Sequence, residues 1–181
     1  NMTGEDHDHG GGDMTLRYAT VAAGGSIAHD VQLDGRTCEC CTTGMALAPA
    51  GPVIAYRDRS AEEIRDISLV RQTADGWTEP RTLNPDGWKI AGCPVNGPQI
   101  DALGDRVAAA WFTAAGEKQK AYVVFSADAG ATFGAPVVIA DGKPAGRVEV
   151  VMLDETSALV TWLEQTPGGA EIRARRVSAD G

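Results

Sequence analysis

The sequence predicts an all-β protein, a β-propeller of four-stranded blades, from three observations. A turn motif recurs at a nearly constant interval, apolar strand-like runs recur at the same interval, and long helical periodicities are few. A period of about fifty residues that contains several strands is typical of propellers, in which each repeat forms one blade. The interval is too short for an array of immunoglobulin-like domains, which need about 100 residues each.

The clearest turn motif lies between two apolar runs in the second half of the chain. Asp128 is a residue type that accepts backbone N–H groups in tight turns, and Gly130 supplies a positive φ where a turn needs one. Ser126 and Thr132 are placed to tie the two ends of the turn together. Phe133 is placed to pack back on the hairpin. We therefore expect a tight hairpin connection here.

Weaker copies of this motif set the period. They begin at Thr20, Thr73 and Ser178, and the clear copy begins at Ser126. Starting positions of 20, 73, 126 and 178 give intervals of 53, 53 and 52 residues. The first copy lacks its aspartate, and the last is cut off by the end of the sequence.

Three apolar runs give an independent check on the period. They align on Tyr56, Trp111 and Trp162, at intervals of 55 and 51 residues. Runs this apolar suit a strand that is buried on both faces, as in the middle of a stacked blade. The alternative interpretation is a set of unrelated strands in an ordinary β-sandwich.

The repeat divides the chain into a flexible His/Asp/Gly-rich lead-in, residues 1–14, and a partial propeller, residues 15–181. The expected parts of the propeller are a leading hairpin at 15–33 and blades at about 41–83, 96–139 and 147–181. A propeller needs about four or more blades to close, so we expect this chain to supply about three blades of a larger, six-bladed propeller. The remainder would lie on a sister fragment or on a second copy of the chain, because open ends expose strand edges.

Composition restricts the classes of partner. The chain has 16 Lys and Arg against 25 Asp and Glu, a net charge of −9. This charge argues against a nucleic-acid ligand, since phosphate binding needs a basic face. No apolar run reaches the length of about eighteen residues that a membrane span needs. The sequence begins with polar residues and not with a signal peptide. A chain from which the export signal has been removed would begin in the same way.

The lead-in carries two histidines beside aspartates. His7 and His9 could hold a transition metal weakly. The alternative is a solvated tail, which we favour because ordering a flexible segment costs conformational entropy.

A candidate site is expected on the face opposite the turn motifs, where the inner strands begin. Counting back 15 residues from the three aligned aromatic residues gives Cys41, Asn96 and Arg147. These positions are equivalent in neighbouring repeats and should converge at the mouth of the central channel. The loop 57–66 and the connection 84–95 should lie on the same face.

Those two segments supply further candidate ligand contacts, which are Arg57, Asp58, Arg65, Asp66 and Trp88. Together with the asparagine and arginine at the channel mouth they form the predicted ligand-binding set. Paired arginines and aspartates can bind a carboxylate or a glycan, and they can equally form salt bridges that stiffen a loop. The tryptophan would offer a stacking platform for a sugar.

All four cysteines fall on the same face, at Cys38, Cys40, Cys41 and Cys93. In one interpretation Cys93 forms a disulfide with a member of the Cys38–Cys41 cluster, as an exported protein would favour. In a second, the thiolates hold a soft ion such as Cu(I) or Zn. In a third, the cysteines are free buried thiols. The spacing matches no standard zinc motif, and the sequence leaves the three interpretations open.

The turn motif at 126–133 resembles the Asp-box of the sialidase-like (BNR-repeat) β-propellers, Ser-x-Asp-x-Gly-x-Thr followed by an aromatic residue. The resemblance gives a structural role to Ser126, Asp128, Gly130, Thr132 and Phe133. It also implies a ligand at the channel mouth, by analogy with the family. Classical sialidases bind the substrate carboxylate with three arginines and use a Tyr–Glu nucleophile pair with an Asp acid/base. That set cannot be assembled here, and the Arg-Ile-Pro signature is absent.

Three functions remain open. We favour an exported, periplasmic or extracellular, glycan- or protein-binding module without a catalytic set. The alternative is an exo-sialidase-type glycoside hydrolase whose site is completed by blades outside this chain. The third is a periplasmic metal-handling or redox protein that uses the cysteine cluster.

Overall fold

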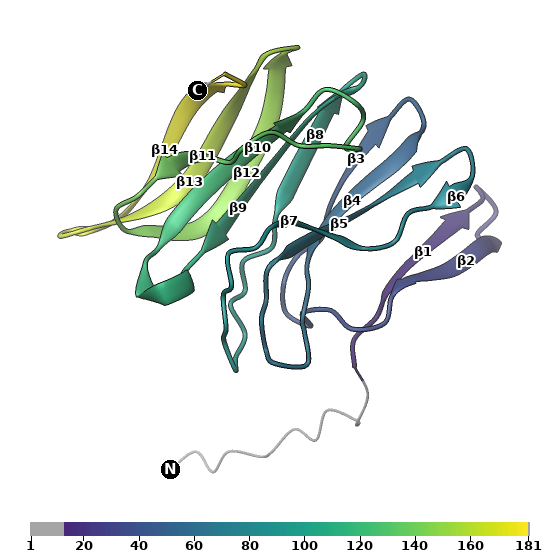
Figure 1. Ribbon diagram of the computed structural model, residues 1–181, viewed down its shortest axis with the longest axis horizontal. Coiled ribbons are helices and arrows are strands. Elements are labelled where there is room, and N and C mark those ends of the chain that lie inside the picture. The colour runs from purple at the N-terminus through teal and green to yellow at the C-terminus, as the bar shows by residue number, and fades with distance from the viewer. Residues whose placement is uncertain (1–12, 181) are drawn as a thin grey trace.

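The computed structural model describes residues 13–180, which form four antiparallel sheets with almost no helix (Figure 1). The all-β prediction is therefore confirmed. The elements are β1 (Leu16–Val21), β2 (Ile27–Asp34), β3 (Gly44–Ala48), β4 (Gly51–Arg57), β5 (Ile67–Thr73), β6 (Gly76–Trp77), β7 (Arg81–Asn84), β8 (Gln99–Leu103), β9 (Arg106–Thr113), the 3-10 turn η1 (Ala115–Glu117), β10 (Lys120–Ser126), β11 (Val137–Ala140), β12 (Pro144–Asp154), β13 (Ser157–Thr166) and β14 (Gly169–Ser178).

Strands that follow one another in the chain pair with one another. The first sheet is the hairpin of β1 and β2. The second sheet contains β3, β4 and β5, together with β6 and β7, which both pair with β5. The third sheet contains β8 to β11, and the fourth contains β12 to β14. The sheets lie side by side in chain order, and the first strand of each larger sheet contacts its neighbour, β3 with β8 and β8 with β12 (Figure 1). No helix in residues 13–180 is long and apolar enough to cross a membrane.

The predicted motif positions coincide with strand ends. β5 ends at Thr73, β10 at Ser126 and β14 at Ser178, and β1 ends at Val21, one residue beyond Thr20. The first two strands, β1 and β2, pair as a hairpin. Nearly all of the predicted lead-in, with both of its histidines, lies outside the described residues, so that expectation stays a prediction.

β9 shows why the recurring runs are apolar throughout. Every residue from Val107 to Thr113 is buried, and successive side chains face opposite sides of the sheet. Val107, Ala109 and Trp111 pack toward the sheet of β3 to β5, and Ala108, Ala110 and Phe112 pack toward the sheet of β12 to β14. The strand therefore serves two cores at once, as the run predicted.

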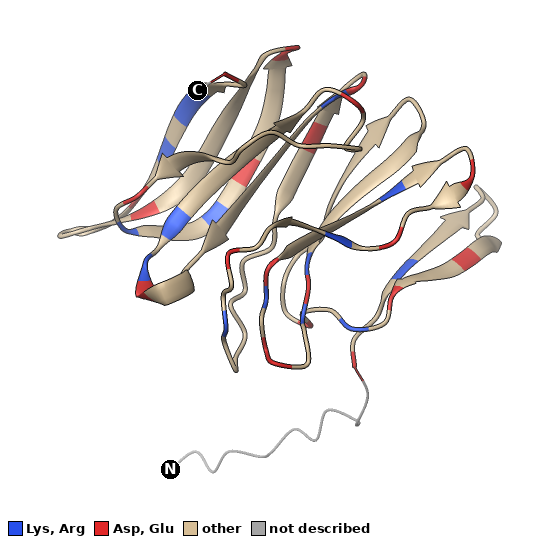
Figure 2. Cartoon of the chain, viewed as in Figure 1, with Lys and Arg blue, Asp and Glu red and all other residues tan. Residues whose placement is uncertain are grey.

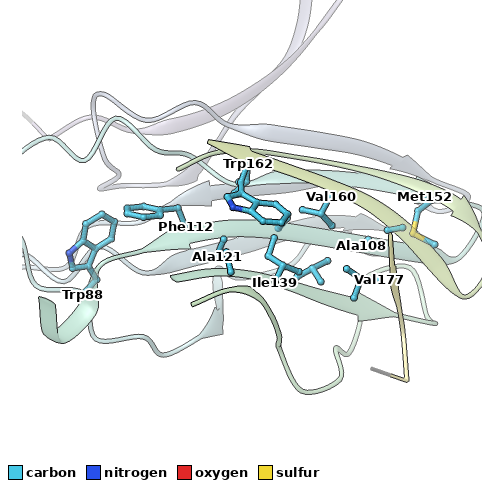
Figure 3. Close-up of a cluster of buried hydrophobic side chains, with 14 residues drawn as sticks. Trp88, Ala108, Phe112, Ala121, Ile139, Met152, Val160, Trp162 and Val177 are labelled. Carbon is cyan, nitrogen blue, oxygen red and sulfur yellow. The ribbon is translucent and has the colours of Figure 1, made fainter. Parts of the chain in front are cut away.

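A separate core fills each gap between neighbouring sheets. The three aligned aromatic residues fall in three different cores, Tyr56 beside the hairpin, Trp111 in the middle and Trp162 in the last. Figure 3 shows the last core, where Trp162 lies between β13 and the sheet that carries Ile139. Each of the three is almost fully buried, so the aligned positions are core positions.

The turn between β10 and β11 has the predicted contacts. Asp128 accepts the backbone N–H of Thr132 at 2.7 Å and its hydroxyl at 2.6 Å, and Ser126 Oγ donates to Asp128 at 2.8 Å. Gly130 has φ 77°. Phe133 packs against the middle core. Because Ser126 pairs with Val107, this turn lies at the start of β9. The predicted site lies beyond the opposite end of β9, where that strand finishes at Thr113.

Candidate functional site

Cys41, Asn96 and Arg147 come together, as their equivalent positions predict. Asn96 Oδ1 accepts the backbone N–H of Arg147 at 3.0 Å, and a backbone hydrogen bond from Asn96 reaches the Cys41 thiol. The approach depends on Gly146, which has φ +89° and where a Cβ would lie 1.8 Å from Asn96 Oδ1. Only glycine fits there, because the backbone is left-handed and the space is filled.

Arg57 lies in the interior and holds three segments together. Its Nε donates to the carbonyl of Asn96 at 2.7 Å, its Nη1 to that of Arg65 at 2.5 Å and its Nη2 to that of Phe112 at 2.7 Å. The guanidinium also lies over the ring of Trp88, 4.8 Å from its centroid. With 1% of its surface exposed, Arg57 is placed as a structural tie and not within reach of a ligand.

Trp88 and the two aspartates are also built into the fold. Trp88 is 7% exposed and packs edge-on against Phe112, so its faces are closed to a sugar. Asp66 accepts the backbone N–H groups of Gly87 and Trp88, both at 2.9 Å. Asp58 accepts Ser68 Oγ at 2.9 Å, and burial raises its pKa. These positions favour structural roles, and ligand binding by these residues stays a prediction.

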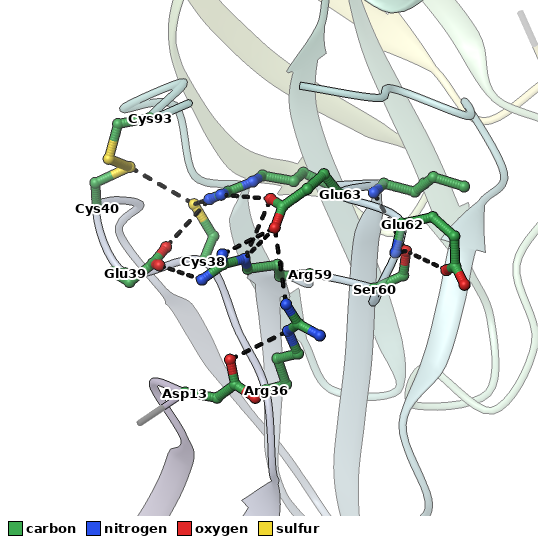
Figure 4. Close-up of polar contacts among 12 residues, drawn as sticks. Asp13, Arg36, Cys38, Glu39, Cys40, Arg59, Ser60, Glu62, Glu63 and Cys93 are labelled. Carbon is green, nitrogen blue, oxygen red and sulfur yellow. Dashed lines mark hydrogen bonds and ion pairs between the residues drawn. A yellow bond between two sulfur atoms is a disulfide. The ribbon is translucent and has the colours of Figure 1, made fainter. Parts of the chain in front are cut away.

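A network of ion pairs joins the loop 57–66 to Glu39 (Figure 4). Arg65 pairs with Glu63 at 2.9 Å and with Glu39 at 3.1 Å, and Arg59 pairs with Glu63 at 2.8 Å and with Glu39. Hydrogen bonds from Arg59 and then Arg65 lower the pKa of Glu63 to about 2. Of these residues, sequence reasoning singled out Arg65 alone. No helix is formed between β4 and β5, so the i, i+4 spacing of Arg59 and Glu63 gave no usable signal.

The ion-pair network forms one side of a cavity of about 780 Å³. The Cys40–Cys93 disulfide, Met14 and Ala91 also line it. Figure 2 shows that positively and negatively charged residues alternate in position along the loops at this end of the sheets. The cavity therefore combines apolar surface with paired charges and has no strong charge of one sign.

The cysteines divide into one disulfide and two thiols. Cys40 and Cys93 form a disulfide across 53 residues, which confirms that Cys93 pairs into the Cys38–Cys41 cluster. Cys38 and Cys41 are free, with their Sγ atoms 3.0 Å apart, and Cys38 Sγ also lies 3.6 Å from Cys40 Sγ. Arg65 Nη1 donates to Cys38 Sγ at 3.2 Å.

The two thiols have opposite acidities. The hydrogen bond from Cys41, aided by Arg65, lowers the pKa of Cys38 to about 5, although burial opposes this. The pKa of Cys41 is raised, first by its hydrogen bond with Cys38 and then by burial. These shifts favour the thiolate form at Cys38 over a thiolate at Cys41.

The sulfur cluster matches a soft-metal site only in part. The Sγ atoms of Cys38, Cys40 and Cys41 lie within 4.8 Å of one another. Thiolates are the sulfur ligands that zinc and Cu(I) take, and a disulfide sulfur is not one. With Cys40 oxidised, the cluster offers two thiols, fewer than the four ligands of a structural zinc site.

A tyrosine–carboxylate pair exists, but in the wrong environment for a nucleophile. Tyr56 Oη donates to Asp34 Oδ2 at 2.5 Å, and Tyr56 is 2% exposed. Burial and then the Asp34 carboxylate raise its pKa. A nucleophilic tyrosine needs the opposite shift and access to substrate, so this pair has no such role.

Comparisons with known proteins place the chain in no sequence family. No family model matches it, and no curated protein matches it. Among solved structures, it is similar to one titled "Hadza microbial sialidase Hz136", with a TM-score of 0.48 and 15% identity over 77% of this chain and 35% of that chain. The chain therefore spans about a third of that structure, and similarity of this degree assigns no activity to it.

Proposed function

We propose that this chain is part of an exported β-propeller whose cysteine-bearing loop face binds a polypeptide segment without catalysing glycoside hydrolysis. Successive antiparallel sheets lie side by side, and the second strands of two of them, β4 and β9, are buried on both faces, which supports blade organisation. The disulfide supports an oxidising compartment, the periplasm or the cell exterior. The observation that carries the proposal is the cavity beside the disulfide.

The cavity suits a polypeptide better than a sugar. Its volume of about 780 Å³ is in the range of ordinary ligand sites. Sugar sites commonly offer an exposed aromatic face, and the predicted platform, Trp88, is buried. The apolar surface of Met14 and the disulfide would accept a side chain. At the edges of the ion pair, Arg59 would donate to backbone C=O groups of the ligand and Glu63 would accept its backbone N–H groups.

The binding proposal is tested by obstructing the cavity. Ala91 is exposed and lines it, so Ala91→Trp should fill part of the space. A peptide selected from a random library on the wild-type protein should lose at least about tenfold in affinity for this variant. Ala74→Trp, at an exposed turn outside the cavity, is the matched control and should bind normally. Binding only to a glycan array, or equal peptide binding by both variants, would contradict the proposal.

The glycosidase alternative has a separate assay. The protein should not hydrolyse a fluorogenic sialoside above the buffer rate, because its tyrosine–carboxylate pair is buried. Saturable turnover would overturn this part of the proposal.

The proposed propeller also needs a partner for its ends. Exposed apolar side chains lie at one end of the row of sheets on the hairpin, at Val21 and Ile27, and at the other on β14, at Ile172. Together with the free strand edges they support association with the missing blades, on a sister fragment or a second copy. Native mass spectrometry should give a mass above the 18.9 kDa of a single chain.

A further inference from the structure

We propose that the four cysteines form a thiol–disulfide relay, in which two electrons pass from the Cys38/Cys41 thiol pair to the Cys40–Cys93 disulfide at the edge of the cavity. The proposal rests on the positions of the sulfur atoms and does not depend on polypeptide binding. Its substrate class is a disulfide, or in the reverse direction a dithiol, that reaches the cavity.

The sulfur atoms of the two thiols form a path of short contacts that leads to the disulfide. Cys41 Sγ is 3.0 Å from Cys38 Sγ, which is 3.6 Å from Cys40 Sγ. Cys40 is bonded to Cys93, an exposed residue that lines the cavity. Cys40 and Cys93 line the cavity, and Cys38 is 6% exposed. A reagent in the cavity therefore contacts Cys93 and Cys40 directly.

The surroundings favour Cys38 as the attacking group. Thiol–disulfide exchange requires a thiolate, and a positive neighbour stabilises that form. Arg65 Nη1 donates to Cys38 Sγ at 3.2 Å, and the lowered pKa of Cys38 agrees with this contact. Arg65 is itself held by Glu39 and Glu63, so its position beside the sulfur is fixed.

The reaction has two exchange steps, and each one balances. In the first step, the Cys38 thiolate attacks Cys40 Sγ and forms a Cys38–Cys40 disulfide. The Cys40–Cys93 bond breaks at the same time, and Cys93 leaves as a thiolate. In the second step, Cys41 loses its proton to solvent, and the resulting thiolate attacks Cys38 Sγ. A Cys38–Cys41 disulfide forms, the Cys38–Cys40 bond breaks, and Cys40 leaves as a thiolate. The pair Cys38/Cys41 is oxidised by two electrons, and the pair Cys40/Cys93 is reduced by two.

The surface dithiol then carries the electrons outward. Its Cys93 thiolate would attack a substrate disulfide in the cavity, and Cys40 would resolve the mixed disulfide and restore the Cys40–Cys93 bond. The substrate leaves as two thiols, and the protein then holds two disulfides. Before the next cycle a cellular dithiol must reduce the Cys38–Cys41 disulfide to two thiols and is itself oxidised to a disulfide.

The first experiment uses the unaltered protein and traps the product of the first step. Native protein with its disulfide intact is incubated with iodoacetamide and no reductant, quenched with acid, and mapped by mass spectrometry of its peptides. The relay predicts time-dependent alkylation of Cys93 together with a Cys38–Cys40 or Cys38–Cys41 disulfide. If Cys93 remains unlabelled while the folded protein keeps only the Cys40–Cys93 disulfide, the proposal is overturned.

Two variants distinguish the steps. Cys38→Ser removes the attacking group and should reduce the rate of Cys93 alkylation by at least about tenfold. Cys41→Ser removes only the second step, so Cys93 should still be alkylated, with Cys38–Cys40 as the sole new disulfide. Equal Cys93 labelling in wild type and Cys38→Ser would overturn the relay. Thermal unfolding of both variants checks that they are folded, and the wild-type experiment stands without them.

Discussion

Replacing Arg57 by methionine tests whether this residue is a structural tie or a ligand contact. Methionine keeps an apolar side chain of similar length and removes the guanidinium. The carbonyls of Asn96, Arg65 and Phe112 then lose donors at 2.7, 2.5 and 2.7 Å. The substitution also removes the contact between the guanidinium and Trp88. The predicted effect is therefore on stability and not on binding alone.

The magnitude follows from the groups left without partners. Each buried carbonyl that loses its donor costs about 1–3 kcal/mol, and the lost cation–π contact adds about 1–2 kcal/mol. Because these terms are not additive and water can reach some of the carbonyls, we expect a loss of about 4 kcal/mol in the free energy of unfolding. That is a large part of the 5–15 kcal/mol of a typical domain.

The measurement is equilibrium unfolding in urea with the disulfide intact. Arg147→Met is the matched control, because Arg147 is exposed and its substitution should change stability by no more than about 0.5 kcal/mol. If Arg57→Met unfolds within about 1 kcal/mol of wild type, the interpretation of Arg57 as a structural tie is wrong, and the ligand role predicted from sequence regains support.

Two further predictions concern the turn at Asp128 and the close contact between Gly97 and Thr42. Hydrogen bonds from Thr132 lower the pKa of Asp128 to about 2 from its ordinary value of 3.8, so its stabilising contribution is present above pH 3.8 and is lost as pH falls toward 2. The melting temperature of Asp128→Asn should lie below that of wild type at neutral pH, with the difference shrinking below pH 4; a pH-independent difference would contradict this. Gly97→Ala should lose at least about 3 kcal/mol in urea unfolding, because its Cβ would lie 1.8 Å from the Thr42 carbonyl oxygen. Gly24→Ala, with nothing within 4 Å, is the control and should be nearly neutral, so equal effects would refute the clash.

The strands and turns were predictable because their signals are local. An apolar run such as that of β9 indicates that the strand is buried on both faces. The residue types of the turn at Asp128 indicate the hydrogen bonds that form within that turn. The convergence of Cys41, Asn96 and Arg147 followed from the repeat, because equivalent positions in adjacent sheets lie side by side. These predictions required only the period and the strand alternation.

The roles of the polar loop residues were not predictable in the same way. Arg57 donates to main-chain carbonyls. Because every residue has such a carbonyl, the residue types in the sequence do not identify these partners. Counting back 18 residues from Tyr56 and Trp111 gives Cys38 and Cys93, so the repeat places these two at equivalent positions. Cys40 forms the disulfide with Cys93 instead, because the direction of the loop backbone and not the strand register orients the sulfur atoms. The pairing of Arg65 with Glu39 joins two loops, and sequence spacing does not report contacts of that kind.

The disulfide and Arg57 act on the same pair of loops, which makes the proposed exchange compatible with a stable fold. A crosslink across 53 residues stabilises by about 4 kcal/mol in the chain-entropy account, so opening Cys40–Cys93 alone would be costly. Arg57, however, still holds the carbonyls of Asn96 and Arg65, and therefore keeps the Cys93 loop against the segment that carries the ion pairs. The sulfur atoms can then change partners while the backbone stays in place. On this reasoning the buried arginine is what allows a redox centre to sit on loops and not on strands.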